Sequence, residues 1–280
     1  MNIQRALQKA NLFLREKNIK TPDLDTQILM SKVLKKKKEF IILNLDIEIT
    51  DKNLEYFNQL VDQRAKGKPI AYLTEKKSFW KYEFTINKEV LIPRPDTEII
   101  VEQVLALTKN KEKMNLLDVG IGSGCILLSI LKDKKSFLGT GIDINNKSLT
   151  ICRINGHNLD VNNRLKLFKS DIDNFNYGKY DLIISNPPYI KKAKLKYLDK
   201  DVIGFEPRQA LDGGIEGLSE IRKVINKSSE LIKKNGFLVL EMGFDQRRQV
   251  KKILENNGFY IKKIVKDLSN NDRCIISIKI

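Results

Sequence analysis

The sequence has few of the residues that build metal centres and disulfide-stabilised folds, with one histidine and three cysteines among 280 residues. Cys125, Cys152 and Cys274 lie far apart, and three cysteines without pairing spacing favour a reducing compartment. With a single histidine and no clustered cysteines, the sequence also argues against the common zinc sites. We therefore expect a cytoplasmic protein without a bound metal.

Long hydrophobic runs are also absent. No stretch approaches the roughly 20 consecutive apolar residues of a transmembrane helix, and residues 1–10 lack the apolar centre of a signal peptide. No association with a membrane is therefore expected. Only 15 glycines and 7 prolines occur while 41% of the residues are hydrophobic, which excludes a collagenous or disordered chain. The length suits one large domain or two modest ones.

Positive charge is in excess, since 51 Lys and Arg face 35 Asp and Glu and leave a formal net charge of +16. Such an excess is typical of proteins that bind polyanions. Most of it is lysine, however, amid abundant Asn and Ile, which is also the result of a coding bias toward A and T. The charge alone leaves both explanations open.

The first 74 residues have the pattern of a small helical domain. Apolar residues from Ile3 to Leu14 recur every three or four positions and predict an amphipathic helix. Thr21, followed by Pro22, predicts the start of a second helix, and Thr50 predicts the start of a later one. We expect this domain to serve recognition.

Residues 75–94 have a different pattern and predict a β-hairpin that links two domains. Residues 79–86 and 89–92 are rich in β-forming side chains, with turn-forming residues between them. Pro93 and Pro95 end the second strand, and Asp96 or Thr97 is expected to cap the helix that follows.

Residues 95–280 alternate between strand and helix patterns, which is typical of an open α/β sheet. Seven strands are predicted, at residues 116–119, 138–142, 165–168, 182–185, 237–240, 260–265 and 275–280. The last strands have short connections and are expected to run antiparallel to the others.

A glycine-rich turn follows the first of these strands, where Gly120, Gly122 and Gly124 precede a predicted helix. Such glycines allow a tight turn and let a ligand approach the backbone at a helix N-terminus. The spacing differs from the Gly-x-Gly-x-x-Gly pattern that binds a pyrophosphate, and no P-loop lysine follows. On its own, the turn indicates either a ligand loop or a merely structural bend.

Two aspartates strengthen the ligand interpretation. Asp143 ends the next predicted strand, where a carboxylate can accept hydrogen bonds from both ribose hydroxyls. Asp171 follows the third strand, at the neighbouring edge, where it could hold an adenine amino group. Either residue could instead cap a helix. Together they favour a nucleoside cofactor.

The most specific segment is Asn186-Pro187-Pro188-Tyr189, which ends an apolar strand. The prolines fix φ and remove two N–H donors, so turn carbonyls and the Asn186 side-chain oxygen can face one donor group. A planar amino group supplies two such donors, and Tyr189 offers a ring face for stacking. The segment therefore predicts a site for a planar NH2 substrate, with a structural Pro-Pro turn as the alternative.

In these features the sequence resembles the class I S-adenosylmethionine-dependent methyltransferases that modify planar amino groups, and among them the PrmC (HemK) family of release factor glutamine methyltransferases. The likeness spans nearly the whole chain. It is carried by Arg64-x-x-Gly67-x-Pro69-x-x-Tyr72, Leu91-Ile-Pro-Arg-Pro-Asp-Thr-Glu98, Asp118-Val-Gly-Ile-Gly-Ser-Gly124, Asn186-Pro-Pro-Tyr-Ile190, Glu206-Pro-Arg-x-Ala-Leu-Asp-Gly213 and Leu240-Glu-x-Gly243.

The resemblance implies an N-terminal all-α domain over residues 1–74, a β-hairpin linker over residues 75–94, and a Rossmann-like methyltransferase domain with a mixed, mostly parallel seven-stranded sheet over residues 95–280. It implies methyl transfer from S-adenosyl-L-methionine to the N5 amide of the glutamine in the Gly-Gly-Gln loop of peptide chain release factors. We expect a monomer that forms no stable complex with nucleic acid.

The resemblance also assigns residues. The cofactor would contact Gly120, Ile121, Gly122, Ser123, Gly124, Asp143, Asp171, Ile172 and Asn186. The glutamine amide would contact Asn186, Pro187, Pro188 and Tyr189, of which Asn186, Pro187 and Tyr189 would be catalytic. Ile172 departs from the pattern, because an aromatic residue that covers the adenine often stands there in the family. That departure puts cofactor affinity in doubt.

Two other functions remain compatible with the sequence. Methylation of an adenine N6 or guanine N2 amino group would use the same acceptors, and the +16 charge favours it. A region for reading DNA bases is not evident, however, because residues 190–235 are too short for one. A non-catalytic module that keeps a nucleoside pocket is the third possibility, although it would not need both Asp143 and Asn186.

Overall fold

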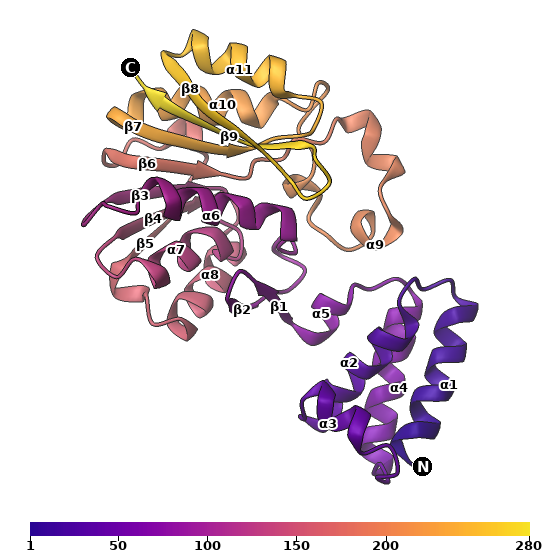
Figure 1. Cartoon of the computed structure of the whole chain (residues 1–280). Coiled ribbons are helices and arrows are strands. Elements are labelled where there is room, and N and C mark those ends of the chain that lie inside the picture. Colours follow the sequence, from indigo (N-terminus) through magenta and orange to yellow (C-terminus); the bar gives the residue numbers. More distant parts are fainter. The chain divides into compact units, whose positions relative to one another are not determined.

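The computed structural model describes all residues, 1–280, and divides into two compact units (Figure 1). The first unit contains Met1–Lys76 together with Leu198–Phe205, and the second contains Lys77–Tyr197 and Glu206–Ile280. Nothing in the sequence pattern indicates that Leu198–Phe205 groups with the helical unit, because the segment is short and far away in the chain.

The first unit is helical, as predicted. Its helices are α1 (Ile3–Glu16), α2 (Pro22–Leu34), α3 (Lys38–Leu43), α4 (Asp51–Ala65), α5 (Ile70–Thr74) and the short α9 (Lys200–Ile203). The apolar stripe of α1, including Ile3 and Leu14, is buried against Leu29 and Phe57 in one core. Thr50 caps α4 as predicted, but Thr21 makes no capping bond to α2.

Two ion pairs of Arg64, one buried and one partly exposed, tie the helices of this unit to Leu198–Phe205. Arg64 of α4 donates from Nε to Asp25 at 2.7 Å and from Nη1 to Asp201 at 2.8 Å. The Arg64 and Asp25 side chains are only 8% and 5% exposed. Burial lowers the pKa of Arg64, but the hydrogen bonds to Asp25 and Asp201 outweigh it and leave the pKa raised. The guanidinium therefore stays charged and satisfies both carboxylates.

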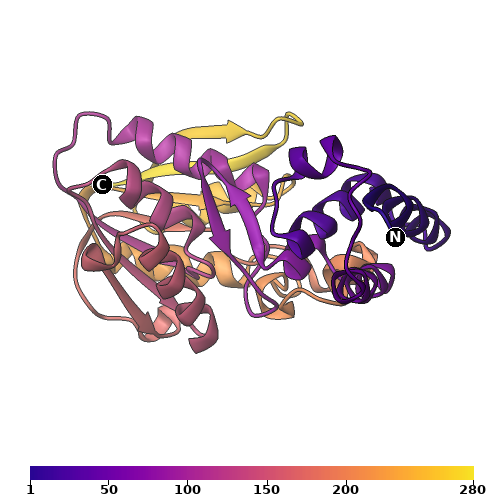
Figure 2. The same ribbon diagram turned by 90° about the horizontal axis from the view of Figure 1, so that it is seen from below.

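The hairpin forms, but its turn lies earlier than predicted. Strands β1 (Lys76–Phe79) and β2 (Tyr82–Thr85) flank a turn at Trp80, which has a positive φ of 56°. The prediction of one strand over 79–86 and another over 89–92 was therefore wrong. The reason is tertiary, because the Trp80 backbone N–H donates to Glu98 and its indole N–H donates to Asp133. Figures 1 and 2 both draw the hairpin next to α8.

The second unit is built on the predicted seven-stranded sheet. Its strands are β3 (Asn115–Val119), β4 (Leu138–Asp143), β5 (Leu165–Lys169), β6 (Tyr180–Ser185), β7 (Ile232–Glu241), β8 (Phe259–Lys266) and β9 (Asp272–Lys279). Their order is β5-β4-β3-β6-β7-β9-β8. Strands β3 to β7 pair in parallel, while β9 pairs antiparallel with β7 and β8. The mixed, mostly parallel sheet is confirmed.

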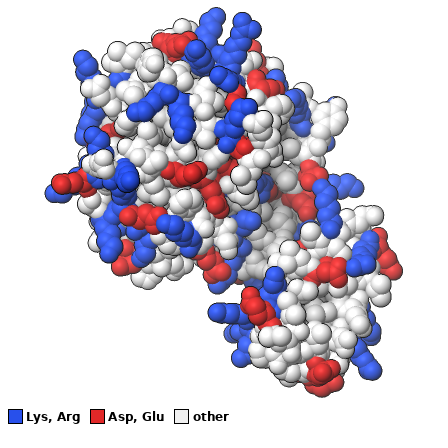
Figure 3. All heavy atoms as spheres, viewed as in Figure 1, with Lys and Arg blue, Asp and Glu red and all other residues white.

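The charged side chains are spread over the surface. On the face drawn in Figure 3, each unit shows Lys and Arg interspersed with Asp, Glu and uncharged residues. No single continuous basic stripe crosses either unit on that face. None of the helices combines the length and apolar composition needed to cross a membrane.

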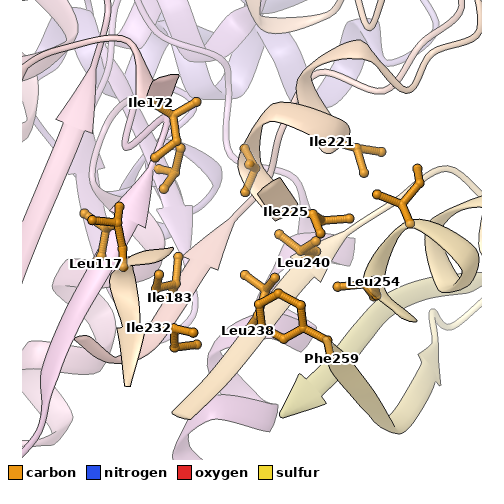
Figure 4. Packing of buried hydrophobic residues seen from close by; sticks show 14 of the residues in the cluster. Leu117, Ile172, Ile183, Ile221, Ile225, Ile232, Leu238, Leu240, Leu254 and Phe259 are labelled. Carbon is orange, nitrogen blue, oxygen red and sulfur yellow. The ribbon is translucent and has the colours of Figure 1, made fainter. Parts of the chain in front are cut away.

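Helices lie on both faces of the sheet (Figures 1 and 2). They are α6 (Glu98–Leu107), α7 (Cys125–Asp133), α8 (Asn146–Asn158), α10 (Ser219–Leu231) and α11 (Arg247–Asn256). The core beneath α10 and α11 is mostly aliphatic, and Figure 4 shows Ile221 and Ile225 of α10 over Ile183 and Leu240 of the strands. This packing holds the sheet against its helices and fixes the strand ends that carry the site.

Candidate active site

The sheet topology brings the predicted site segments together at one edge. Strand order reverses between β3 and β6, and Val119 at the end of β3 pairs with Ser185 at the end of β6. Val119 also pairs with Ile142 of β4. The Ser185 hydroxyl donates to the Val119 carbonyl at 2.7 Å, which joins the two strand ends. Ligands of open α/β sheets bind at such a reversal, beyond the carboxyl ends of the strands.

The glycine-rich turn leaves room for a ligand. Gly120, Gly122 and Gly124 all have positive φ, at 74°, 54° and 81°. A Cβ at Gly120 or Gly122 would meet no atom closer than 4.0 Å, so the backbone there borders open space. At Gly124, by contrast, a Cβ would lie 2.7 Å from Cys152 and Leu128. The first two glycines therefore expose the backbone, while the third allows the turn to pack on the protein.

Asp143 holds this turn and still has acceptor capacity. Its Oδ2 accepts from the Gly122 N–H at 3.0 Å, and its Oδ1 accepts from the Asn145 N–H at 2.8 Å. Burial raises the pKa of Asp143, while these two backbone hydrogen bonds lower it in part. Each carboxylate oxygen can accept a second hydrogen bond. The residue can thus fix the turn and also bind a ribose hydroxyl pair.

The aspartate and isoleucine after β5 are placed differently. Asp171 caps a short turn of 3-10 helix (Ile172–Asn174) through its Oδ1, which accepts from the Asp173 N–H at 3.0 Å. Ile172 is 5% exposed and belongs to the core cluster shown in Figure 4. An adenine could accordingly contact the remaining carboxylate oxygen of Asp171 and one side of the Ile172 side chain. Together with the open backbone at Gly120 and Gly122, the arrangement fits a nucleoside cofactor.

The Asn-Pro-Pro-Tyr segment directly follows β6, beside the glycine-rich turn. Asn186 Nδ2 donates to the hydroxyl Oγ1 of Thr97 at 3.2 Å. No hydrogen bond within the protein uses Asn186 Oδ1 or the Pro187 carbonyl. Two acceptors therefore remain available at the end of β6, as a planar amino group requires.

Tyr189 is anchored by residues that the sequence did not single out for the site. Its hydroxyl donates to Glu241 Oε1 at 3.0 Å, and Arg273 Nη1 lies 3.3 Å from the same hydroxyl. Burial is the main cause that raises the pKa of Tyr189, and the Glu241 charge raises it further, so the phenol stays neutral. Glu241 lies in the Leu240-Glu-x-Gly243 segment, which could have pointed to it from the sequence, whereas no sequence feature pointed to Arg273.

Further hydrogen bonds brace this edge, and those of Ile92, Arg94 and Glu206 come from segments that the sequence singled out. The side chain of Arg94 pairs with that of Glu206, which also accepts from the Ile92 N–H at 3.1 Å. Gln246 Nε2 donates to the Tyr189 carbonyl at 3.0 Å and to the Gly217 carbonyl at 2.9 Å. These bonds hold the chain before Thr97 and after Asn186.

Two groups near the glycine-rich turn have pKa values that burial raises. Burial raises the pKa of Cys125 to about 12, so its thiol stays protonated at neutral pH. Burial likewise raises the pKa of Asp118, at the end of β3, to about 7. No thiolate nucleophile is therefore provided here, and the arrangement relies on hydrogen-bond acceptors.

Both parts of the chain match known families. Residues 5–74 match the model of the PrmC N-terminal domain, and residues 96–262 match that of the methyltransferase small domain. The chain is 38% identical over 282 residues to the release factor glutamine methyltransferase of Clostridium acetobutylicum, with 100% of this chain and 99% of the relative covered. It is 32% identical to that of Caulobacter vibrioides, with 100% and 97% covered.

The fold matches solved structures as well. A ribosomal protein L11 methylase from Lactobacillus delbrueckii subsp. bulgaricus superposes with a TM-score of 0.51 at 16% identity. The match covers 70% of this chain and 84% of that chain. At this identity the likeness shows the fold alone.

Proposed function

This chain belongs to the family of release factor glutamine methyltransferases, and we propose that Asn186, Pro187 and Tyr189 carry out its methyl transfer. The enzyme transfers a methyl group from S-adenosyl-L-methionine to the side-chain amide nitrogen of a release factor glutamine. The target we propose is the glutamine of the Gly-Gly-Gln loop. S-adenosyl-L-methionine supplies an electrophilic methyl group on its sulfonium sulfur.

Orientation is the main contribution of the protein. An amide nitrogen is a weak nucleophile because its lone pair is delocalised into the carbonyl. Asn186 Oδ1 and the Pro187 carbonyl accept the two amide hydrogens, so that the nitrogen lone pair faces the methyl group. Holding reactants in this way can supply roughly 7–11 kcal/mol in favourable cases. The same acceptors stabilise the positive charge that develops on nitrogen, and the proton then leaves to water.

The remaining assignments concern binding. Asp143 accepts from the ribose, and Pro188 and Tyr189 form the wall against the planar amide. The cofactor is also bound by Gly120, Ile121, Gly122, Ser123, Gly124, Asp171 and Ile172. Residues 1–74 recognise the release factor, and the enzyme acts as a cytoplasmic monomer without a stable nucleic acid complex.

One observation carries this proposal. The register that pairs Val119 with Ser185 sets the glycine-rich turn and Asn186 side by side, and the two acceptors at Asn186 and Pro187 are free of protein donors. A methyl donor bound at the turn and a planar amide bound at the acceptors would therefore meet at the carboxyl end of β3 and β6.

Transfer of a labelled methyl group from S-adenosyl-L-methionine tests the proposal. Purified release factor is compared with a version whose loop is Gly-Gly-Ala, and with total RNA and DNA. Label on the Gly-Gly-Gln factor alone is expected. Label that persists on the Gly-Gly-Ala factor would refute the proposed target, and label only on nucleic acid would support base methylation instead.

A further inference from the structure

Thr97 occupies the position expected for a helix cap and does not cap the helix. It precedes α6 with αR backbone angles and makes no side-chain capping bond. The prediction that Asp96 or Thr97 caps this helix was wrong, because Asp96 lies within the 3-10 helix Pro95–Thr97 and Thr97 makes no capping bond. The residue is 2% exposed, and its Oγ1 accepts from Asn186 Nδ2 at 3.2 Å. The helix backbone does not bond this buried hydroxyl, so its proton needs another acceptor.

Glu241 of β7 offers an acceptor near Thr97. The residue is 2% exposed, and its Oε1 accepts from the Tyr189 hydroxyl, whereas the buried Oε2 has no hydrogen-bond partner. Burial is the largest influence on the pKa of Glu241 and raises it, while the Thr97 hydroxyl lowers it, so Thr97 lies close enough to interact with this carboxylate. The unpartnered carboxylate oxygen is therefore available to the single proton of Thr97.

The direction in which the Thr97 proton points sets the orientation of the Asn186 amide. A hydroxyl has one hydrogen, and when that hydrogen points at Glu241, only lone pairs of Oγ1 face Asn186. Asn186 must then present its NH2 group to Thr97, and its Oδ1 turns away from it. If the amide were flipped, its NH2 group would face the substrate amide hydrogens, and donor would meet donor.

We propose that Thr97, with its proton held by Glu241, is a positioning residue that orients the Asn186 amide so that Oδ1 is free to accept a hydrogen from the substrate. The inference rests on the proposed role of Asn186 as a substrate acceptor. Thr97 itself touches neither substrate nor cofactor, so its effect is on the rate of transfer. Arg273 Nη1 donates to the Tyr189 hydroxyl at 3.3 Å and so extends this network.

Two substitutions at Thr97 separate orientation from packing. Thr97→Val keeps the shape but removes the acceptor, and we expect kcat to fall roughly ten- to a hundredfold. The Kd for S-adenosyl-L-methionine and the KM for the release factor should stay within about threefold. Thr97→Ser keeps the hydroxyl and should restore kcat to near the original value. Equal losses in both variants would refute the orientation role, because they would trace the effect to the lost methyl group.

Glu241→Gln tests the direction of the proton and does not depend on the folding of Thr97→Val. The glutamine NH2 can donate to Thr97, which would turn the Thr97 proton toward Asn186 and favour the flipped amide. We expect kcat to fall at least tenfold, and Thr97→Val combined with Glu241→Gln to be no slower than Thr97→Val alone. Independent, multiplying losses would overturn the proposal.

Asn186→Ala, measured in parallel, distinguishes this inference from the proposed function. If Asn186→Ala abolishes transfer and Thr97→Val does not slow it, only the role of Thr97 fails. If Asn186→Ala transfers the methyl group at the original rate, the assignment of Asn186 as substrate acceptor fails.

Discussion

Asp118 gives a direct test of how the buried end of β3 responds to pH. Its side chain is 2% exposed, and burial is the main cause that raises its pKa from 3.8 to about 7. The Leu127 backbone N–H lowers the pKa by hydrogen bonding, and the nearby Asp143 charge raises it. Because the folded pKa lies above the unfolded one, the folded state binds the proton more tightly. The contribution of Asp118 to stability is therefore full in acid, below its unfolded pKa, and is lost as the pH rises through the folded pKa.

The size of the effect follows from the pKa values. One unit of pKa difference corresponds to about 1.4 kcal/mol, so a shift of about three units amounts to about 4 kcal/mol at pH 8. About 3 kcal/mol of this is lost between pH 5 and pH 8, because the unfolded carboxyl is already ionised at pH 5. The free energy of unfolding should decline over this interval by that amount on account of Asp118 alone.

Asp118→Asn removes the ionisation while preserving the shape. The asparagine can still accept from the Leu127 N–H, and any cost of its buried NH2 group is the same at both pH values. Between pH 5 and pH 8, the free energy of unfolding of the variant should therefore fall by about 3 kcal/mol less than that of the original protein. Urea unfolding, followed by the fluorescence of Trp80 in the same unit, measures it. Asp173→Asn, at an exposed carboxyl, is the matched control.

The result that would refute this reasoning is a parallel pH dependence. If the original protein and Asp118→Asn lose the same free energy of unfolding between pH 5 and pH 8, Asp118 does not carry a raised pKa in the folded state. A larger decline in the variant would also contradict the expected sign, because it would mean that the folded state binds the Asp118 proton less tightly than the unfolded state.

Three further substitutions test the site and the helical unit. Asn186→Ala should lower kcat by about 10²- to 10³-fold with little change in cofactor Kd, and equal losses in both quantities would contradict its role. Asp143→Ala should raise the cofactor Kd at least tenfold, since charged hydrogen bonds contribute about 1.5–3 kcal/mol each. Titration calorimetry measures this Kd, and an unchanged value would contradict the role of Asp143. Arg64→Met leaves Asp25 buried without its charged partner and should destabilise the helical unit by about 3–5 kcal/mol. Hydrogen exchange of the amides in α1 to α5 measures this loss, and unaltered protection of those amides would contradict the prediction.

The sequence alone determined the features that depend on local pattern. The seven strands follow from short apolar runs bounded by turn residues, and the parallel order follows from their alternation with helices. Gly120 to Gly124 and Asn186 to Tyr189 were identified because chemistry needs those residue types in that order over a few positions. Positive φ and missing N–H donors are properties of glycine and proline wherever they stand.

Only the tertiary structure decided the features that join distant segments. The turn at Trp80 moved because Glu98 and Asp133 accept its N–H groups, which no pattern within the hairpin indicates. Leu198–Phe205 joins the helical unit through a bond between Arg64 and Asp201, 137 positions apart.

The same reason governs the active site. Thr97 has the sequence context of a helix cap, but its hydroxyl accepts from Asn186, 89 positions away, because the fold brings the start of α6 to the end of β6. Glu241 and Arg273 reach Tyr189 from β7 and β9, which adjoin in the sheet although 32 positions separate the two residues in the chain. Local sequence selects the groups that we propose for the chemistry, and the tertiary fold decides which distant side chains hold them in place.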